Sequence, residues 1–118
     1  MAHALQAADT AEAKKGERIV ILDMRDVTLI ADYFVIISAM NVIQVQSIAD
    51  AVDGVMAAQG LERLNREGVS KAHWLLLDYG ALVVHVFTEE ERAYYNLERL
   101  WGDAVVVDRA SLRANQQG

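Results

Sequence analysis

The side chains that could do chemistry are few and widely spaced in this 118-residue chain. Asp23 and Asp26 follow an apolar run, with Arg25 between them, at the kind of strand end where α/β proteins often place functional groups. A single Asp-x-x-Asp is more typical of a turn with local ion pairing. Ser38 ends another apolar run, a place suited to phosphate binding, but the next residue is Ala39 instead of a glycine that lets a phosphate approach the backbone. A phosphate-binding enzyme therefore stays as an alternative function.

The remaining residue types also fail to form a complete reaction centre. His3, His73 and His85 lack the three- or four-residue spacing of a metal pair on a helix, and a buried, hydrogen-bonded His85 is the favoured interpretation. The chain has no cysteine, which excludes disulfides, thiolate zinc sites and thiol catalysis. Its glycines are isolated, so no phosphate loop is present. We therefore expect no metal, no cofactor and no enzymatic activity.

Aromatic residues are the more informative group, because Trp and Tyr concentrate binding energy when they anchor interfaces. For Tyr94 and Trp101 we favour packing of a helix against the core. Trp74 and Tyr79 flank one strand and the turn after it, so at least part of each is expected to be exposed. Alternation along that strand separates its side chains into two sets. These are Trp74, Leu76 and Asp78 on one side and Leu75, Leu77 and Tyr79 on the other. The pattern does not decide which set forms a contact face.

The element that organises the chain is the hairpin containing this strand. Two apolar runs over residues 74–77 and 82–87 flank Asp78-Tyr79-Gly80, a turn signal, and each run is too short for a helix. Apolar residues occupy both odd and even positions, which favours a sheet covered by helices on both faces.

Other patterns place the remaining elements. Helices are expected over residues 2–15, from the Asn41 cap to Gly60, and from Glu89 to about Trp101, with capping boxes at the last two. Strands are expected over 18–23, 33–38, 61–64 and 105–108, with one helical turn at 28–31 and a loop at 65–72. If its strands are parallel, the unit from 33 to 64 is a right-handed βαβ unit. The prediction is one α/β domain over residues 1–108, a mixed sheet flanked by helices, and a tail over 109–118 whose order is open.

The charge of the chain constrains its partners. Its formal charge is −6, with 17 acidic and 11 scattered basic residues, which argues against bare nucleic acid as the main partner. An acidic surface suits a basic protein, although solubility alone explains it equally well. The chain shows neither a membrane-length apolar run nor a secretion signal, so a cytoplasmic location is expected.

Five segments in order together resemble the ribosomal silencing factor, or Iojap-like, family. They are Asp32-Tyr-Phe-Val-Ile-Ile-Ser38, Gln46-Ser-Ile-Ala-Asp50, Trp74-Leu-Leu-Leu-Asp-Tyr-Gly80, Val83-Val-His-Val-Phe87 and Tyr95-Asn-Leu-Glu-Arg-Leu-Trp-Gly-Asp103. The resemblance implies a nucleotidyltransferase-like fold without the catalytic carboxylates. A residual nucleotidyltransferase-like activity around Asp23, Asp26 and Ser38 is therefore the enzyme alternative. It also implies binding to the large ribosomal subunit through its fourteenth protein, a basic protein at the subunit interface, which blocks subunit joining and represses translation.

Carried over to this chain, the resemblance places the partner-binding patch on Trp74, Leu76, Asp78, Tyr79 and Gly80, with Tyr95 beside them. The same apolar patch could pair two copies of the chain, so a homodimer is a further expectation. Docking on ribosomal RNA itself is the rival binding mode. It would show itself as RNA affinity that falls steeply with salt.

Overall fold

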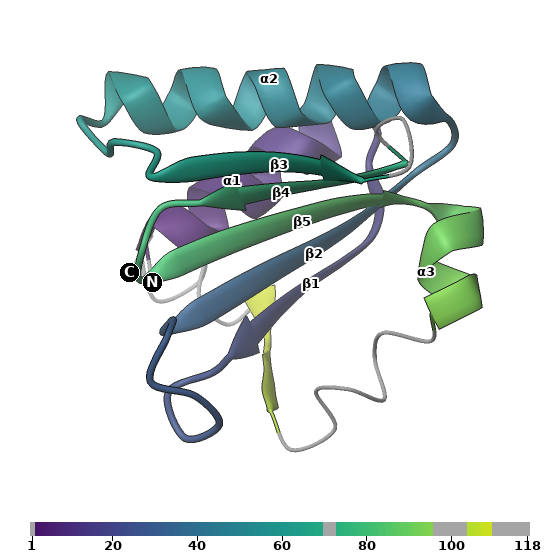
Figure 1. Cartoon of the computed structure of the whole chain (residues 1–118). Coiled ribbons are helices and arrows are strands. Elements are labelled where there is room, and N and C mark those ends of the chain that lie inside the picture. Colours follow the sequence, from purple (N-terminus) through teal and green to yellow (C-terminus); the bar gives the residue numbers. More distant parts are fainter. Residues whose placement is uncertain (1, 70–72, 96–103, 110–118) are drawn as a thin grey trace.

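The structure is a computed structural model, and it describes residues 2–69, 73–95 and 104–109. Within these ranges, three helices accompany a mixed sheet with the strand order β3-β4-β5-β2-β1-β6 (Figure 1). The elements are α1 (Ala2–Ala13), β1 (Glu17–Asp23), β2 (Tyr33–Ala39), α2 (Val42–Ala58), β3 (Asn65–Val69), β4 (Trp74–Asp78), β5 (Leu82–Thr88), α3 (Glu89–Tyr95) and β6 (Val105–Val107). Strands β2 and β5 are parallel, and every other neighbouring pair is antiparallel. The predicted mixed α/β sheet is confirmed.

The β4–β5 hairpin lies where the sequence predicts it. Trp74 faces Phe87 and Leu76 faces His85 across the ladder. The connecting turn needs Gly80, whose φ of 89° lies in a region that side chains with a Cβ rarely adopt. The Gly80 N–H donates to the Asp78 carboxylate at 2.8 Å, which closes the turn.

Helix α2 is set by its cap and its apolar stripe. The Asn41 side chain accepts a hydrogen bond from the Gln44 N–H at 2.9 Å, and the Gln44 side chain accepts one from the Met40 N–H at 2.6 Å. The predicted capping box is therefore present, but the Gln44 side chain bonds to the N–H of Met40, one residue before the Asn41 cap. Five side chains of the stripe are buried against the sheet: Val45, Ile48, Ala49, Val52 and Met56.

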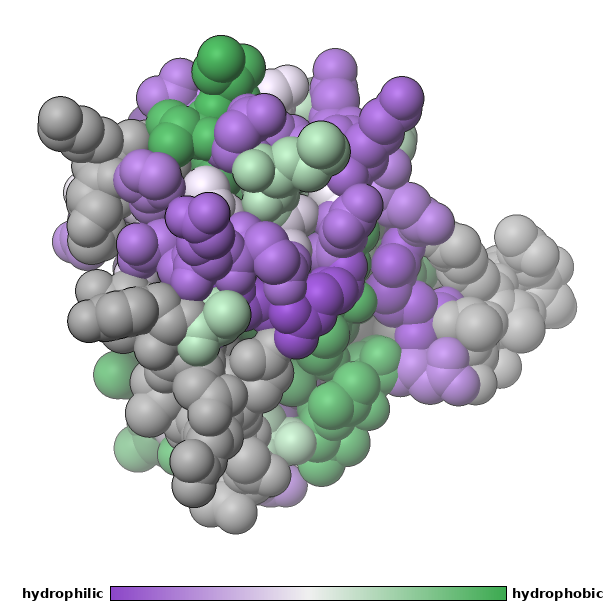
Figure 2. All heavy atoms as spheres, turned by 90° about the vertical axis from the view of Figure 1, so that its right-hand side faces the viewer, coloured by the Kyte–Doolittle hydropathy of each residue, from purple (hydrophilic) through white to green (hydrophobic). Residues whose placement is uncertain are grey.

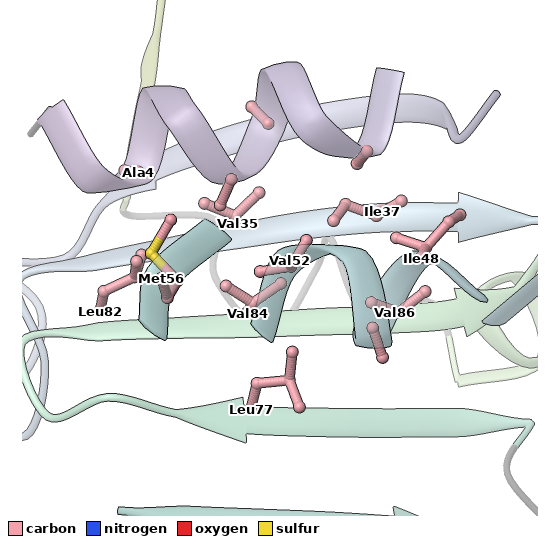
Figure 3. Packing of buried hydrophobic residues seen from close by; sticks show 14 of the residues in the cluster. Ala4, Val35, Ile37, Ile48, Val52, Met56, Leu77, Leu82, Val84 and Val86 are labelled. Atoms are coloured by element: carbon pink, nitrogen blue, oxygen red, sulfur yellow. The ribbon is translucent and has the colours of Figure 1, made fainter. Parts of the chain in front are cut away.

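Helices α1 and α2 pack side by side on the same face of the sheet (Figure 1). Alanines of α1 let the helix approach closely, since Ala7, Ala8 and Ala11 are completely buried. Gly16 continues this close packing, because a Cβ there would lie 2.9 Å from Ile37 Cγ2 and 3.0 Å from the Ala11 carbonyl oxygen. Figure 3 shows the resulting core, where side chains of α2 meet those of β2, β5 and β4.

Three expectations about elements are wrong. Residues 61–64 form no strand, and the expected loop instead contains the edge strand β3. An edge strand that faces water can be polar, which is why its sequence resembles a loop. The crossover from β2 through α2 therefore leads to a strand that is separated from β2 by β5 and β4. Residues 28–31 contain a bend, not a helical turn.

The C-terminal elements are described in part. Strand β6 confirms the predicted last edge strand, and it pairs with β1. Helix α3 begins at Glu89 after the Thr88 cap, whose hydroxyl accepts from the Glu91 N–H at 3.3 Å. Its predicted continuation to Trp101 lies outside the described residues. Arg109, at the predicted start of the tail, forms ion pairs with α1, so the boundary between domain and tail stays a prediction.

Candidate functional site

The structure shows which side chains of β4 face the helices, a choice that the alternation along the strand does not decide. Leu75 and Leu77 are buried in the core beneath the helices. Trp74, Leu76 and Asp78 therefore point to the opposite face, which we call the second face of the sheet, and all three are only partly buried. They lie along one strand, at successive outward positions. The structure thus brings three of the predicted contact residues together on one surface.

Ring packing beneath this surface fixes the position of Trp74. Its ring centroid lies 4.8 Å from that of Phe87 and 6.1 Å from that of His85, in tilted arrangements. His85 in turn stacks on Phe87 at 5.8 Å and lies 4.9 Å from Phe34. The Trp74 indole N–H donates to His85 Nδ1 at 3.4 Å. Because its neighbours already hold the indole, little side-chain freedom remains to be lost when a partner binds there.

His85 is the buried polar member of this ring cluster, as the sequence predicts. Burial among apolar rings disfavours the charged imidazolium and lowers the pKa of His85 to about 4. The side chain is therefore neutral near pH 7, in a state that can accept the Trp74 hydrogen bond. Its role in the structure is to orient the indole.

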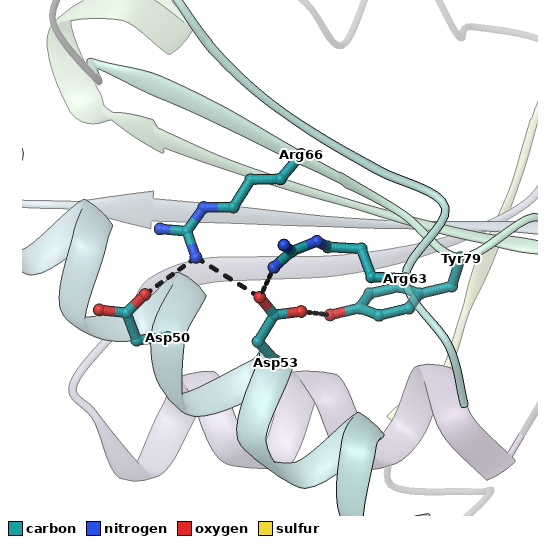
Figure 4. Close-up of polar contacts among 5 residues, drawn as sticks. All are labelled: Asp50, Asp53, Arg63, Arg66 and Tyr79. Carbon is teal, nitrogen blue, oxygen red and sulfur yellow. Dashed lines mark hydrogen bonds and ion pairs between the residues drawn. The ribbon is translucent and has the colours of Figure 1, made fainter. Parts of the chain in front are cut away.

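Tyr79 belongs to the other face, which corrects the expectation that it is partly exposed. It is only 6% exposed, and its hydroxyl donates a hydrogen bond to the Asp53 carboxylate on α2 (Figure 4). Arg63 and Arg66 form ion pairs with the same carboxylate, and Arg66 also reaches Asp50 at 2.9 Å. Burial raises the pKa of Tyr79. The cluster fastens the hairpin turn and strand β3 to α2, so Tyr79 supports the contact surface from below.

Tyr79→Phe should lower the free energy of unfolding by about 1 kcal/mol, the usual net contribution of one hydrogen bond. The ring stays in place, and Asp53 keeps Arg63 and Arg66 as partners, so the loss stays small. Urea unfolding at neutral pH measures it. A loss above about 3 kcal/mol would instead mean that Asp53 depends on the hydroxyl for its burial.

The other two predicted contact residues are Gly80 and Tyr95. Gly80 lies in the turn directly after Asp78, at one end of the strand. Tyr95 is the last residue of α3, and its side chain lies outside the described residues. The structure therefore places Gly80 beside Asp78 at the end of the contact strand, and leaves the contribution of Tyr95 as a prediction.

Of the three residues considered for catalysis, Asp23 and Ser38 are engaged in internal contacts, whereas Asp26 is exposed. Asp23 accepts three hydrogen bonds from Arg25, and the pKa of its carboxyl falls to about 2 mainly because of the Arg25 side chain. The Ser38 hydroxyl is buried and accepts a hydrogen bond at 2.8 Å from Arg92, which is only 2% exposed. Among the described residues, no group of three or more His, Asp and Glu side chains is arranged to hold a metal ion. No helix in that part of the chain is long and apolar enough to cross a membrane.

Arg92 is a residue whose importance the sequence does not show. It is the fourth residue of α3, and its side chain donates hydrogen bonds to the Arg18 carbonyl oxygen at 2.7 Å and to Ser38. It thereby joins α3 to the ends of β1 and β2. No local pattern predicts contacts over such a sequence separation.

Comparison with known proteins gives the chain a family. Residues 1–118 match the family model described as "Ribosomal silencing factor during starvation". The chain belongs to this ribosomal silencing factor family. The chain is 47% identical over 102 residues to the ribosomal silencing factor of Halalkalibacterium halodurans, covering 86% of this chain and 87% of the relative. With the Bacillus subtilis factor it shares 44% identity over 102 residues, covering 86% of each.

More distant and structural relatives agree with this assignment. The chloroplastic protein Iojap of Zea mays is 31% identical over 111 residues, which cover 92% of this chain and 47% of that protein. A crystal structure from Bacillus halodurans superposes with a TM-score of 0.78 at 41% identity, covering 92% of this chain and 99% of that one. A Chromobacterium violaceum structure gives the same TM-score at 31% identity, covering 81% and 80%.

Membership in the ribosomal silencing factor family confirms the resemblance that the five segments predict. The family is named for silencing ribosomes and not for a catalysed reaction, which agrees with a role other than catalysis. The solved relatives show the same mixed α/β fold. Likeness to nucleotidyltransferases stays a prediction.

Proposed function

We propose that this protein binds the large ribosomal subunit through the subunit's fourteenth protein and prevents the small subunit from joining. Family membership supports the ribosome as target. The observation that carries the proposal is the line of Trp74, Leu76 and Asp78 on the second face of the sheet. Aromatic and apolar groups that are partly exposed and rigidly held are typical of the centre of a protein interface.

The mechanism is steric, so it requires an interface and no reacting group. A specific interface commonly covers about 800 Å² on each partner, with a few anchors supplying most of the binding energy. Trp74 is such an anchor, because the rings of Phe87 and His85 fix its orientation before the partner arrives. A factor bound at the face where the subunits meet excludes the small subunit for as long as it stays bound.

The net charge of −6 fits a basic ribosomal protein as the partner. Opposite charge speeds encounter and disfavours unwanted partners more than it adds affinity. The same surface could pair two copies of this protein when no ribosome is present, in which case dimer and ribosome compete for it. The proposed setting is the cytoplasm, where free subunits are found.

Sedimentation of the purified protein with ribosomal subunits tests the proposal. We expect it to travel with free large subunits, to be absent from joined ribosomes, and to reduce the joined fraction when added before the small subunit. Addition of the isolated fourteenth protein should compete for binding. Equal binding to small subunits, or no change in joining at saturation, would contradict the proposal. A steep fall with salt that persists on protein-free ribosomal RNA would favour RNA docking instead.

A further inference from the structure

A second group of exposed apolar side chains lies outside the residues assigned to the contact surface. Leu29 and Ile30, in the loop between β1 and β2, have exposed fractions of 104% and 83%. Leu64, just before β3, is 68% exposed. Large apolar side chains held this far into water contribute little to folding, so their exposure calls for another explanation.

The loop that carries Leu29 and Ile30 is firmly anchored. Its flanking residues Met24 and Ala31 are buried, and the Met24 N–H donates to the Asp32 carbonyl at 2.7 Å across the base of the loop. Inside the loop, the Thr28 hydroxyl accepts a hydrogen bond from the Ile30 N–H at 3.1 Å. The two apolar side chains are therefore presented on an ordered backbone, which lowers the entropic cost of using them in a contact.

An ion pair stiffens the same loop at its start. Arg25 binds Asp23 through two side-chain hydrogen bonds of 3.0 and 2.7 Å, and its guanidinium lies over the Tyr33 ring at 5.4 Å from the centroid. The side chain of Arg25 thus bridges β1 and β2 at the point where the loop leaves the sheet. Its positive charge is also matched locally by Asp23.

This loop meets the β4–β5 turn at one end of the sheet. The Asp32 and Tyr33 N–H groups both donate to the Ala81 carbonyl oxygen, at 2.7 and 3.0 Å. Leu64 reaches the same turn, because its N–H donates to the Asp78 carbonyl and its side chain lies 3.5 Å from the position of a Cβ on Gly80. We call this region, which consists of residues 26–32, Leu64 and residues 78–81, the turn end (Figure 1). It continues directly from the surface formed by Trp74, Leu76 and Asp78.

The turn end has an acidic rim around its apolar side chains. Asp26 and Asp32 are exposed and Asp78 is partly exposed. Arg25, which lies next to Asp26 in the chain, forms its ion pair with Asp23, and Arg63, next to Leu64, forms one with Asp53. An apolar tip bordered by exposed carboxylates fits an apolar hollow bordered by Lys or Arg, and it opposes the phosphates of RNA.

We propose that the turn end is a second anchor of the ribosome-binding interface, in which Leu29 and Ile30 enter an apolar hollow on a basic ribosomal protein. This rests on the proposed function and extends it, because the interface then runs from Trp74 along β4 to the β1–β2 loop. Two separated anchors fix the angle at which the protein stands on the subunit. A single anchor would leave that angle free, and the blocking mechanism depends on it.

The test compares two matched double variants. Leu29→Ser with Ile30→Ser removes the tip. Met40→Ser with Ile43→Ser removes two apolar side chains at the other end of β2 that are also highly exposed (76% and 80%). Figure 2 shows hydrophobic surface at that other end, where α2 begins. Both pairs are so exposed that neither variant should change the midpoint of urea unfolding.

The expected result is about a tenfold loss of affinity for large subunits in the loop variant and none in the control. Neutralising the rim with Asp26→Asn and Asp32→Asn should also weaken binding and reduce its salt dependence. Wild-type affinity in the loop variant would overturn the second anchor while leaving the proposed function intact. Stronger binding by the Asp26→Asn, Asp32→Asn variant would overturn it in favour of RNA. A change in the oligomeric state of the loop variant, with its affinity for large subunits unchanged, would overturn it in favour of self-association. Failure of the unaltered protein to bind would remove both proposals.

Discussion

Leu76→Lys is expected to reduce the affinity for large ribosomal subunits about 100-fold, which corresponds to ~3 kcal/mol of binding free energy. Leu76 occupies the middle of the line formed with Trp74 and Asp78 on the second face. The substitution removes an apolar contact at the centre of the proposed interface. It also places a positive charge against a basic partner, which like-charge repulsion makes costly.

The fold should accept this change. Glu67 on β3 lies directly across from Leu76 in the register, so a lysine there meets an opposite charge at the closest cross-strand position. The aliphatic part of the lysine also covers the surface that the leucine covers. Thermal unfolding should therefore shift by only a few degrees, for a loss of about 1 kcal/mol or less.

Ile43→Lys is the matched control, because Ile43 is 80% exposed on α2 and lies away from the second face. It adds the same charge at a site that the proposal does not use. Equal loss of binding in both variants would indicate a nonspecific charge effect. Tighter binding by Leu76→Lys would indicate an anionic partner and would transfer the proposal from the ribosomal protein to ribosomal RNA.

The strands at the centre of the sheet could be predicted from the sequence. Strands β2 and β5 are buried over most of their length, so their apolar runs stand out from the polar segments beside them. Strand β3 could not be found in this way. Its residues Asn65, Arg66 and Glu67 face α2 or water, and the strand exists because β4 offers an unpaired edge.

The contact surface was predictable in its position along the chain but not in its orientation. Leucines on both sides of β4 hide which set faces the helices. The placement of Tyr79 depends on a hydrogen bond to Asp53, 26 residues earlier, and no local pattern reports such a bond. The sequence predicts a helical turn around Leu29, because a short run of apolar residues has the same pattern whether it is exposed or buried.

Acidification from pH 7 to pH 4 should lower the free energy of unfolding by about 3 kcal/mol through His85 alone. In the folded protein the pKa of His85 is about 4, lowered from 6.5 by burial among aromatic rings. The unfolded chain therefore binds a proton as the pH falls through 6.5, while the folded protein does not until about pH 4. The unfolded state binds more protons across this window, so stability is complete above it and is lost as the pH decreases.

His85→Gln isolates this contribution, because glutamine is neutral throughout and its oxygen can accept the hydrogen bond that the Trp74 indole donates. The variant should be less stable at pH 7, yet lose much less stability between pH 6.5 and pH 4. His3→Gln is the control for the loss of an imidazole elsewhere in the chain, since His3 is exposed near the start of α1. Urea unfolding at half-unit pH intervals supplies the measurement.

The contribution of Asp23 to the pH dependence can be told apart from that of His85. Because the pKa of Asp23 is lowered to about 2, this carboxyl changes the free energy of unfolding only below about pH 4. An unchanged slope in His85→Gln would mean that His85 has the same pKa in the folded and the unfolded protein, and that burial among the aromatic rings does not lower it.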